Sequence, residues 1–332
     1  MKKYTTITVL LINLISRSAI AGHDYNFLNT SVIAGTLEIE AGYSHDNTLN
    51  PSSKHSAATL NLQYDASINK AISTHVTLLQ EDDTSPEFDE ALITIDMANG
   101  FTLTAGKLYL AFGNHESNMI SDSLPLELSE ARETAVQIDH IKDSLTTSLY
   151  FFKADALKNN SNESINNIGF NIESNKNKSK LGFSYRNNIT NSTLISESIA
   201  TSPALVSYVP GASVYANVLF AQTSLFFEYV SALNEFDSST LTFNFNKAQP
   251  ASVNFELGLN TARSVIGIAF QASRESLSLG LPESRLLLSY NINSMKNRSL
   301  IFEFSQQKDY SVTNGGSGNA TTAFTAQFVM TF

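Results

Sequence analysis

Cysteine and tryptophan are absent from this sequence of 332 residues, and so is any long apolar run. Without cysteine there are no disulfides, so the fold must draw its stability from other sources. The most apolar stretch, residues 7–15, is well short of the ~20 residues that a membrane-spanning helix needs. We therefore predict no transmembrane helix. Any aromatic belt at a membrane surface must consist of the 12 tyrosines and 21 phenylalanines.

Basic residues are scarce as well: 21 Lys and Arg stand against 31 Asp and Glu, a formal net charge of −10. Residues 1–21 contain three of the basic residues and no acidic one, so removing them changes −10 to −13. Proteins that bind nucleic acid carry a basic surface. The composition therefore argues against nucleic acid as a partner, although it does not exclude a local basic patch.

The first 21 residues have the three parts of a secretory signal peptide. Lys2 and Lys3 form a positive start, residues 7–15 form a short apolar centre, and Ala-Ile-Ala at 19–21 matches a cleavage site. The alternative is a buried N-terminal helix or an uncleaved anchor, which the short apolar stretch makes less favourable. We predict a cleaved signal peptide read by the Sec pathway, followed by a short periplasmic segment at residues 22–31.

Alternation of apolar and polar residues runs through the rest of the chain, as in β-strands whose two faces meet different surroundings. Residues 37–43 and 58–64 are clear examples, and tyrosine ends the apolar face of both. Other faces carry charge in mid-strand, among them Glu228, Glu256 and Glu303. A sandwich of ~300 residues would usually divide into two domains, and we see no linker. The pattern predicts an all-β fold, a transmembrane antiparallel β-barrel at residues 32–332.

The number of strands is less certain than their type. Roughly 17 segments alternate, whereas a bacterial barrel has an even number of strands. Residues 72–80 and 88–97 are the weakest candidates, and residues 241–245 alternate as well. We predict about 16 strands, with 14 or 18 open, joined by long outer loops and short periplasmic turns.

The last strand is apolar at every second residue from Phe324 to Phe332. A closing barrel strand must face lipid along its length, although an ordinary sandwich strand is an alternative. The terminal Phe resembles the C-terminal signal that outer-membrane barrels present to their assembly machinery. We therefore expect contact with that machinery, with outer-membrane lipid and with lipopolysaccharide, in the outer membrane of a Gram-negative cell.

Residues 110–132 are too apolar for a surface loop and also carry several charged side chains. We expect this segment to fold into the barrel as a constriction, with its charges facing the pore; a loop packed over the barrel mouth is the alternative. The candidate pore residues are Lys107, Phe112, Asn114, His115, Glu116, Asn118, Asp122, Glu127, Arg132, Glu133, Arg186 and Arg285.

Several motifs around this segment resemble the LbtU family of siderophore porins. They are Gly106-Lys-x-Tyr-x-x-Phe-Gly-Asn, Glu116-Ser-Asn-Met-Ile-Ser-Asp, Leu126-Glu-Leu, Arg132-Glu, Val209-Pro-Gly, Phe227-Glu-Tyr-Val-x-Ala-Leu, Leu279-Gly-Leu-Pro-x-Ser-Arg285 and Asp309-Tyr-Ser before Gly315-Gly. The resemblance covers residues 87 to 332 and implies a 16-stranded outer-membrane barrel that takes up a ferric siderophore without TonB. It does not name the siderophore. Family members often carry an N-terminal extension, whereas only residues 22–31 precede the first predicted strand here.

Size argues independently against plug-gated uptake. A TonB-dependent receptor has 22 strands around a plug, and at ~10 residues per strand little of this chain would remain for the plug. An anionic ferric siderophore would require basic groups in the lumen. The candidates are Lys107, Arg132, Arg186, Arg263 and Arg285; pairing with lumen carboxylates is their alternative role.

Other functions have weaker support. His115, Glu116 and Asp122 lack the spacing of a metal site, and we predict neither a metal nor a cofactor. A barrel hydrolase would need a marked nucleophile beside a histidine, and nothing marks Ser117 or Ser121 near His115, so we predict no enzyme. A general diffusion porin for small polar solutes remains the main alternative to a siderophore porin. The two differ in whether a siderophore blocks the conductance.

Overall fold

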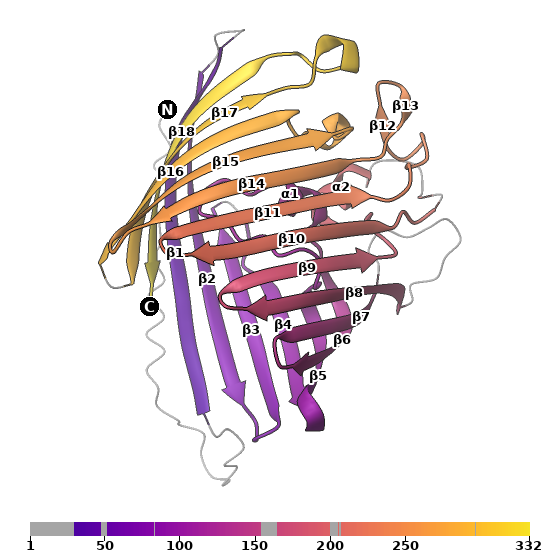
Figure 1. Cartoon of the computed structure of the whole chain (residues 1–332), viewed down its shortest axis with the longest axis vertical. Helices are drawn as coiled ribbons and strands as arrows, with labels where there is room; N and C mark the ends of the chain where they lie inside the picture. The colour runs from indigo at the N-terminus through magenta and orange to yellow at the C-terminus, as the bar shows by residue number, and fades with distance from the viewer. Residues whose placement is uncertain are drawn as a thin grey trace.

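The computed structural model describes residues 30–47, 52–82, 84–153, 165–199, 205, 207–295 and 297–332. Within these residues, sixteen antiparallel strands form one closed barrel (Figure 1). Neighbours along the chain pair in turn, and β1 closes the ring against β18. The predicted signal peptide, and residues 22–29 of the predicted periplasmic segment, lie outside the described residues.

The barrel strands follow one another in chain order. They are β1 (Thr30–Asp46), β2 (Ser52–Ser67), β3 (Ile72–Glu81), β4 (Glu87–Asp96), β5 (Phe101–Tyr109), β6 (Arg132–Lys142), β7 (Leu145–Lys153), β8 (Ile165–Lys176), β9 (Ser179–Arg186), β10 (Gly211–Phe220), β11 (Thr223–Ala232), β14 (Ala251–Asn260), β15 (Ser264–Arg274), β16 (Ser284–Met295), β17 (Arg298–Lys308) and β18 (Ala320–Thr331). The predicted fold class, with 16 strands in the ring, is confirmed.

Both weak strand candidates are barrel strands, β3 and β4. The surplus candidate is residues 241–245, and counting it as a barrel strand was wrong. There, β12 (Thr242–Phe243) pairs with β13 (Asn246–Lys247) in a separate two-stranded hairpin. Asn244 and Phe245 at its turn both have positive φ, as a type I′ turn requires. The hairpin lies in the connection between β11 and β14, beyond the end of the wall (Figure 1).

The strand register explains the alternation. Phe255 pairs with Phe270, and Phe270 pairs with Leu286, so apolar residues form continuous rows across neighbouring strands. These three side chains are between 43% and 50% exposed, whereas Glu256 on the opposite face is fully buried. The apolar rows therefore face outward and the polar rows face the lumen, as in a membrane barrel. Among the described residues, no helix has the length and apolar character needed to cross a membrane.

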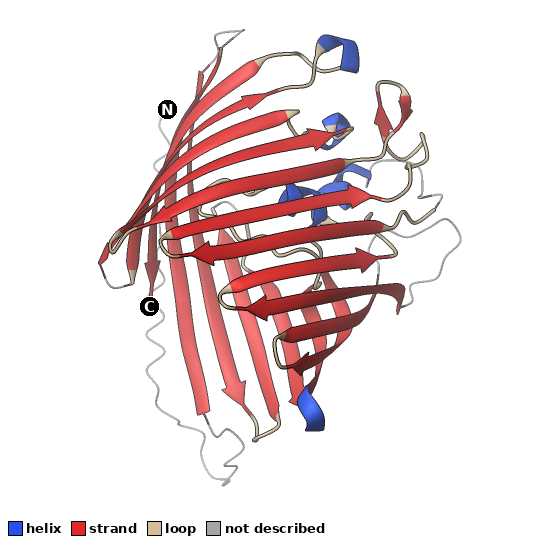
Figure 2. Ribbon diagram, in the orientation of Figure 1, coloured by secondary structure: helices blue, strands red, loops and turns tan. Residues whose placement is uncertain are grey.

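The C-terminal strand closes the barrel as predicted. Leu37 on β1 pairs with Met330 on β18, and Gly35 and Phe332 exchange backbone hydrogen bonds of 2.9 and 3.0 Å. Short turns connect the strands at the end of the barrel where Phe332 lies, and the long connections lie at the other end. The helices α1 (Leu124–Ser129) and α2 (Thr193–Ile199) belong to that second set of connections (Figure 2).

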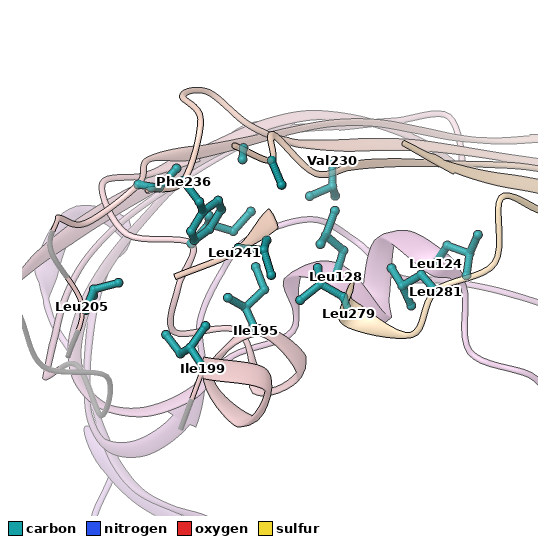
Figure 3. Packing of buried hydrophobic residues seen from close by; sticks show 14 of the residues in the cluster. Leu124, Leu128, Ile195, Ile199, Leu205, Val230, Phe236, Leu241, Leu279 and Leu281 are labelled. Carbon is teal, nitrogen blue, oxygen red and sulfur yellow. The ribbon is translucent and has the colours of Figure 1, made fainter. Parts of the chain in front are cut away.

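The main apolar core lies inside the barrel mouth instead of between two sheets. Phe112, Leu124 and Leu128 come from the connection between β5 and β6, and they pack against three other long connections (Figure 3). These contribute Ile189, Ile195, Ile199, Leu205 and Val209 after β9, Phe236 and Leu241 after β11, and Leu279 and Leu281 after β15. The mouth of the barrel is therefore covered on the β9–β15 side by a dry core.

Candidate pore constriction

The connection between β5 and β6, residues 110–131, folds into the barrel, and we call it the inner segment. Its two ends meet at the wall, because the Leu110 backbone N–H donates to the Ala131 carbonyl at 3.0 Å. The chain then reaches β9, three strands from β6 in the ring, where the Gly113 N–H donates to the Ser184 hydroxyl at 3.0 Å. From there it follows the lumen face strand by strand.

Glu228 of β11 binds the first turn of the inner segment. Its carboxylate accepts the backbone N–H groups of Asn114 and His115, both at 3.1 Å, and it also faces the His115 ring at 3.3 Å. Gly113 and His115 have φ values of +81° and +42°. Such left-handed residues turn successive N–H groups toward one anion. A Cβ on Gly113 would lie 2.3 Å from the Glu228 carboxylate, so only glycine fits there.

Two further glutamates repeat this arrangement. Glu256 of β14 accepts the Asn118 backbone N–H and side-chain amide, both at 2.6 Å, and the Ser117 hydroxyl at 2.8 Å. Glu303 of β17 accepts the Ile120 and Ser121 N–H groups at 2.7 and 3.2 Å, and the Ser121 hydroxyl. The Ser289 hydroxyl of β16 donates to the Asn118 carbonyl at 2.9 Å.

Glu228, Glu256 and Glu303 therefore hold the inner segment against the wall from β11 to β17, and we call them the anchoring glutamates. All three are buried, at 5%, 0% and 2% exposure. A buried carboxylate is stable only when hydrogen-bond donors surround it, and here the backbone of the segment supplies many of them. The sequence showed these residues as mid-strand charges but gave no partner for them. Two sequence features could have indicated this contact: the lumen-facing positions of the three glutamates in the alternation, and the Asn and Ser residues of the inner segment.

After Ser121 the inner segment returns along the wall through α1. Ser123 caps this short helix by accepting the Leu126 N–H, and Pro125 stands in its first turn. Arg285 of β16 fixes the return path, because it donates to the Asp122 carbonyl at 3.0 Å and to the Glu127 carboxylate at 3.1 Å. Arg285 thus points into the lumen as predicted, but its charge is engaged by the segment.

Arg186 of β9 is also on the lumen face, yet it is fully buried. Its guanidinium carbon lies 4.5 Å from the centre of the Phe112 ring, a cation–π contact, and one N–H approaches the Ile189 carbonyl at 3.4 Å. Phe112 is itself 2% exposed in the dry core. Both residues were predicted to line the pore, and the structure places both inside the packing that supports the segment.

The remaining candidates divide into two groups. Glu116 on the inner segment pairs with Lys180 of β9, and Glu133 is buried and accepts the Asn191 side-chain amide. Lys107 and Arg132 share the outward face of their strands, because Lys107 is opposite Ala91 and Arg132 is opposite Tyr109. Both were expected in the pore, Arg132 as the last residue of the segment 110–132 and Lys107 as a basic group of the lumen; the strand register places them on the other face. Their partners are the Phe88 carbonyl for Lys107, and Glu87 and Asp89 for Arg132.

Enclosure in the lumen changes the proton affinity of the acids on the inner segment. Burial raises the pKa of Asp122, Glu127 and Glu130 above their usual values, while Arg285 lowers that of Asp122 and Glu127. The Asp122 side chain has few close neighbours, but the surrounding wall displaces water from it at longer range. Protonation of these acids therefore begins at a higher pH than for exposed carboxyls.

His115 gives a pH-dependent contact between segment and wall. Burial alone would lower its pKa, but the Glu228 carboxylate, with smaller contributions from Glu130 and the Phe112 carbonyl, raises it above the usual 6.5. A raised pKa means that protonated His115 stabilises the folded segment, fully below pH 6.5 and less as pH rises through the shifted value. We expect protease cleavage within the segment to increase with pH over that range. His115→Gln should remove the dependence, and a dependence that persists in this variant would show that another group titrates.

Comparison with known proteins identifies relatives whose names assign no activity. It also identifies solved structures that share the fold of this chain. No family model matches the chain. Its relatives include UPF0422 proteins from Coxiella burnetii, 24% identical over 225 residues, and from Legionella pneumophila strain Lens, 24% identical over 243 residues. These matches cover 63% and 67% of this chain but 48% and 46% of the relatives, so the chain spans about half their length. They do not confirm the LbtU family.

Solved structures with the same fold are outer-membrane porins. The anion-selective porin from Comamonas acidovorans superposes with a TM-score of 0.67 at 9% identity, over 91% of this chain and 99% of that one. The outer membrane channel DcaP of Acinetobacter baumannii gives 0.64 at 11%, over 91% and 97%. Salmonella typhi OmpF, in complex with daunomycin, gives 0.62 at 11%, over 93% and 99%. The chain therefore has the fold of an outer-membrane porin.

Proposed function

We propose that this protein is a passive outer-membrane channel for small polar solutes, narrowed by the inner segment. The observation that carries the proposal is the attachment of this segment to the lumen wall by the three anchoring glutamates. A loop that merely covered the mouth would not need buried carboxylates at mid-strand to hold its backbone. The same wall supports the proposed environment: its outward apolar rows suit contact with membrane lipid and lipopolysaccharide, and its closing strand suits recognition by the assembly machinery.

The inner segment narrows the lumen without filling it. It lies against β9 to β17, whereas side chains on the lumen face of β1 to β4 keep partial exposure, including Glu38, Glu40 and His75. A hydrolytic site has less support, because the Ser117 and Ser121 hydroxyls donate to Glu256 and Glu303. His115, the histidine of the same segment, faces Glu228 and the Phe112 carbonyl instead.

Ferric-siderophore uptake is the second candidate, and it is supported by the family resemblance of motifs that fall in the inner segment. The electrostatics support it less. Arg132 lies on the outward face of β6, and in the lumen Arg285 pairs with Glu127 and Lys180 with Glu116, so the basic groups that an anionic complex would need are already engaged. Arg263 is exposed in the short turn between β14 and β15, away from the segment.

Planar-bilayer recording tests the proposal. Purified full-length protein should give stepwise ionic conductance that ferric trihydroxamate and ferric citrate, used as probes, leave unchanged. Block by one of these probes, together with protein-dependent uptake of the same labelled complex by cells, would favour the siderophore channel instead. Protein that inserts in folded form and gives no steps would contradict a channel of either kind. A heat-unfolded sample provides the control for leakage from detergent.

A further inference from the structure

Asp122 lies at the turn where the inner segment leaves the wall at β17. The preceding residue, Ser121, is bound to Glu303 of β17, and β17 is separated from β1 only by β18. The following residues turn back into α1, which contacts β11, β14 and β15. The Asp122 side chain is exposed, and no side-chain donor bonds its carboxylate among the hydrogen bonds of the described residues. Its carboxylate therefore meets solvent inside the lumen.

The open side facing this turn is acidic as well. Glu38 and Glu40 lie on the lumen face of β1, opposite Val329 and Gln327 of β18. Both are partly exposed; Glu38 accepts the Gln327 amide at 3.4 Å, and Glu40 faces a ring nitrogen of His55 at 3.0 Å. Burial is the largest cause of the raised Asp122 pKa; Arg285 and His115 lower this pKa, and the Glu40 carboxylate is near enough to raise it. Farther along the same wall, Asp65 and Glu90 flank His75.

The carboxylates near this opening outnumber the cations. Arg285 donates to the Asp122 carbonyl and to the Glu127 carboxylate, and its charge also attracts the Asp122 carboxylate, so one arginine serves two acids of the inner segment. Lys180 is paired with Glu116 on the β9 side of the lumen. The two walls of the opening therefore carry charge of the same sign, and carboxylates in a confined lumen raise the local concentration of cations.

We infer that the passage runs between Asp122 and the Glu38–Glu40 edge of β1, and that these three carboxylates make it selective for cationic and neutral solutes over anions. The inference rests on the proposed function and adds a substrate class to it. Polyanionic ferric complexes would then be excluded by charge, whereas small ammonium- or guanidinium-bearing solutes would enter.

The test is the triple variant Glu38→Gln, Glu40→Gln and Asp122→Asn, recorded in planar bilayers under a KCl gradient. The reversal potential of wild-type protein should indicate that K⁺ permeates more readily than Cl⁻. In the variant, the permeability ratio of K⁺ to Cl⁻ should fall at least about threefold, because three charges leave the opening. A control variant loses three exposed acids at the outer ends and connections, Glu81→Gln, Asp82→Asn and Glu235→Gln, and should retain at least most of the wild-type ratio.

The outcomes separate the two proposals. Wild-type protein that conducts, but whose ratio is unchanged in the triple variant or falls equally in the control, overturns the inference and leaves the channel standing. Wild-type protein that conducts nothing overturns both. If the triple variant does not fold, Asp122→Asn alone decides, because that side chain is exposed and its carboxylate accepts no side-chain hydrogen bond from the described residues. A reversal potential of anion selectivity in wild-type protein would also overturn the inference.

Discussion

Replacing Glu256 and Glu303 together by alanine is expected to release the inner segment and raise the single-channel conductance. Each carboxylate accepts three hydrogen bonds from residues 117–121. Hydrogen bonds to a charged group contribute about 1.5–3 kcal/mol each. Removing the carboxylate also relieves the cost of burying its charge, so we expect a net loss of about 3 kcal/mol per glutamate, which would raise the population of detached segment roughly a hundredfold for each substitution. We expect larger current steps, added noise, and protease cleavage near Met119.

A deletion sets the upper limit for this effect. Removing residues 112–129 and joining Ala111 to Glu130 preserves the Leu110–Ala131 hydrogen bond, so the β5–β6 hairpin can still close. The conductance of the double alanine variant should lie between those of wild-type protein and this deletion. Glu256→Gln with Glu303→Gln is the matched control, because glutamine keeps one acceptor oxygen and should release the segment less. Alanine and deletion variants that fold and conduct like wild-type protein would show that the inner segment is not the constriction.

The barrel could be predicted from the sequence because its physical cause is local. A strand that separates lipid from lumen alternates at every residue, and Phe255, Phe270 and Leu286 occupy the outward rows that this alternation predicts. Closure by the last strand followed from the same reasoning. Alternation does not indicate how long a strand is, however. Residues 241–245 alternate, but they lie in a hairpin whose two strands have two residues each. Leu241 is apolar there because it packs in the dry core, whereas Phe245 at the turn is 98% exposed.

The constriction was only partly predictable, because its contacts join distant parts of the chain. The composition of residues 110–132 predicted an inward fold, and the structure has it. Which wall residues would bind the segment could not follow from local pattern, since Glu303 and Ser121 are 182 residues apart. For Lys107 the alternation within its own strand indicates the correct face. It shares the alternation of Leu103 and Ala105, which places it on the outward face.

Gly106→Ala is expected to prevent stable closure of β4 against β5. Gly106 has φ of +142°, and a Cβ built on it would lie 2.1 Å from the Ala91 carbonyl oxygen and 2.7 Å from the Leu92 Cα. Both obstacles are backbone atoms of the paired strand, so no side-chain rotation can relieve the overlap. We expect a loss of about 4 kcal/mol or more in the free energy of unfolding, at the upper end for single substitutions.

Heat-modifiable mobility on gels, and the midpoint of urea unfolding in detergent or lipid, measure this effect. Ala105→Val is the matched control, because it adds volume at the neighbouring position on the outward face, where Ala105 lies opposite Ile93 and Val136. This control should fold with a midpoint near that of wild-type protein. The comparison isolates the approach of the two backbones, since both variants enlarge a small residue of β5. Gly106→Ala protein with a wild-type urea midpoint would show that β4 moves away from β5 at little cost. The start of the inner segment, four residues later, would then not depend on this approach.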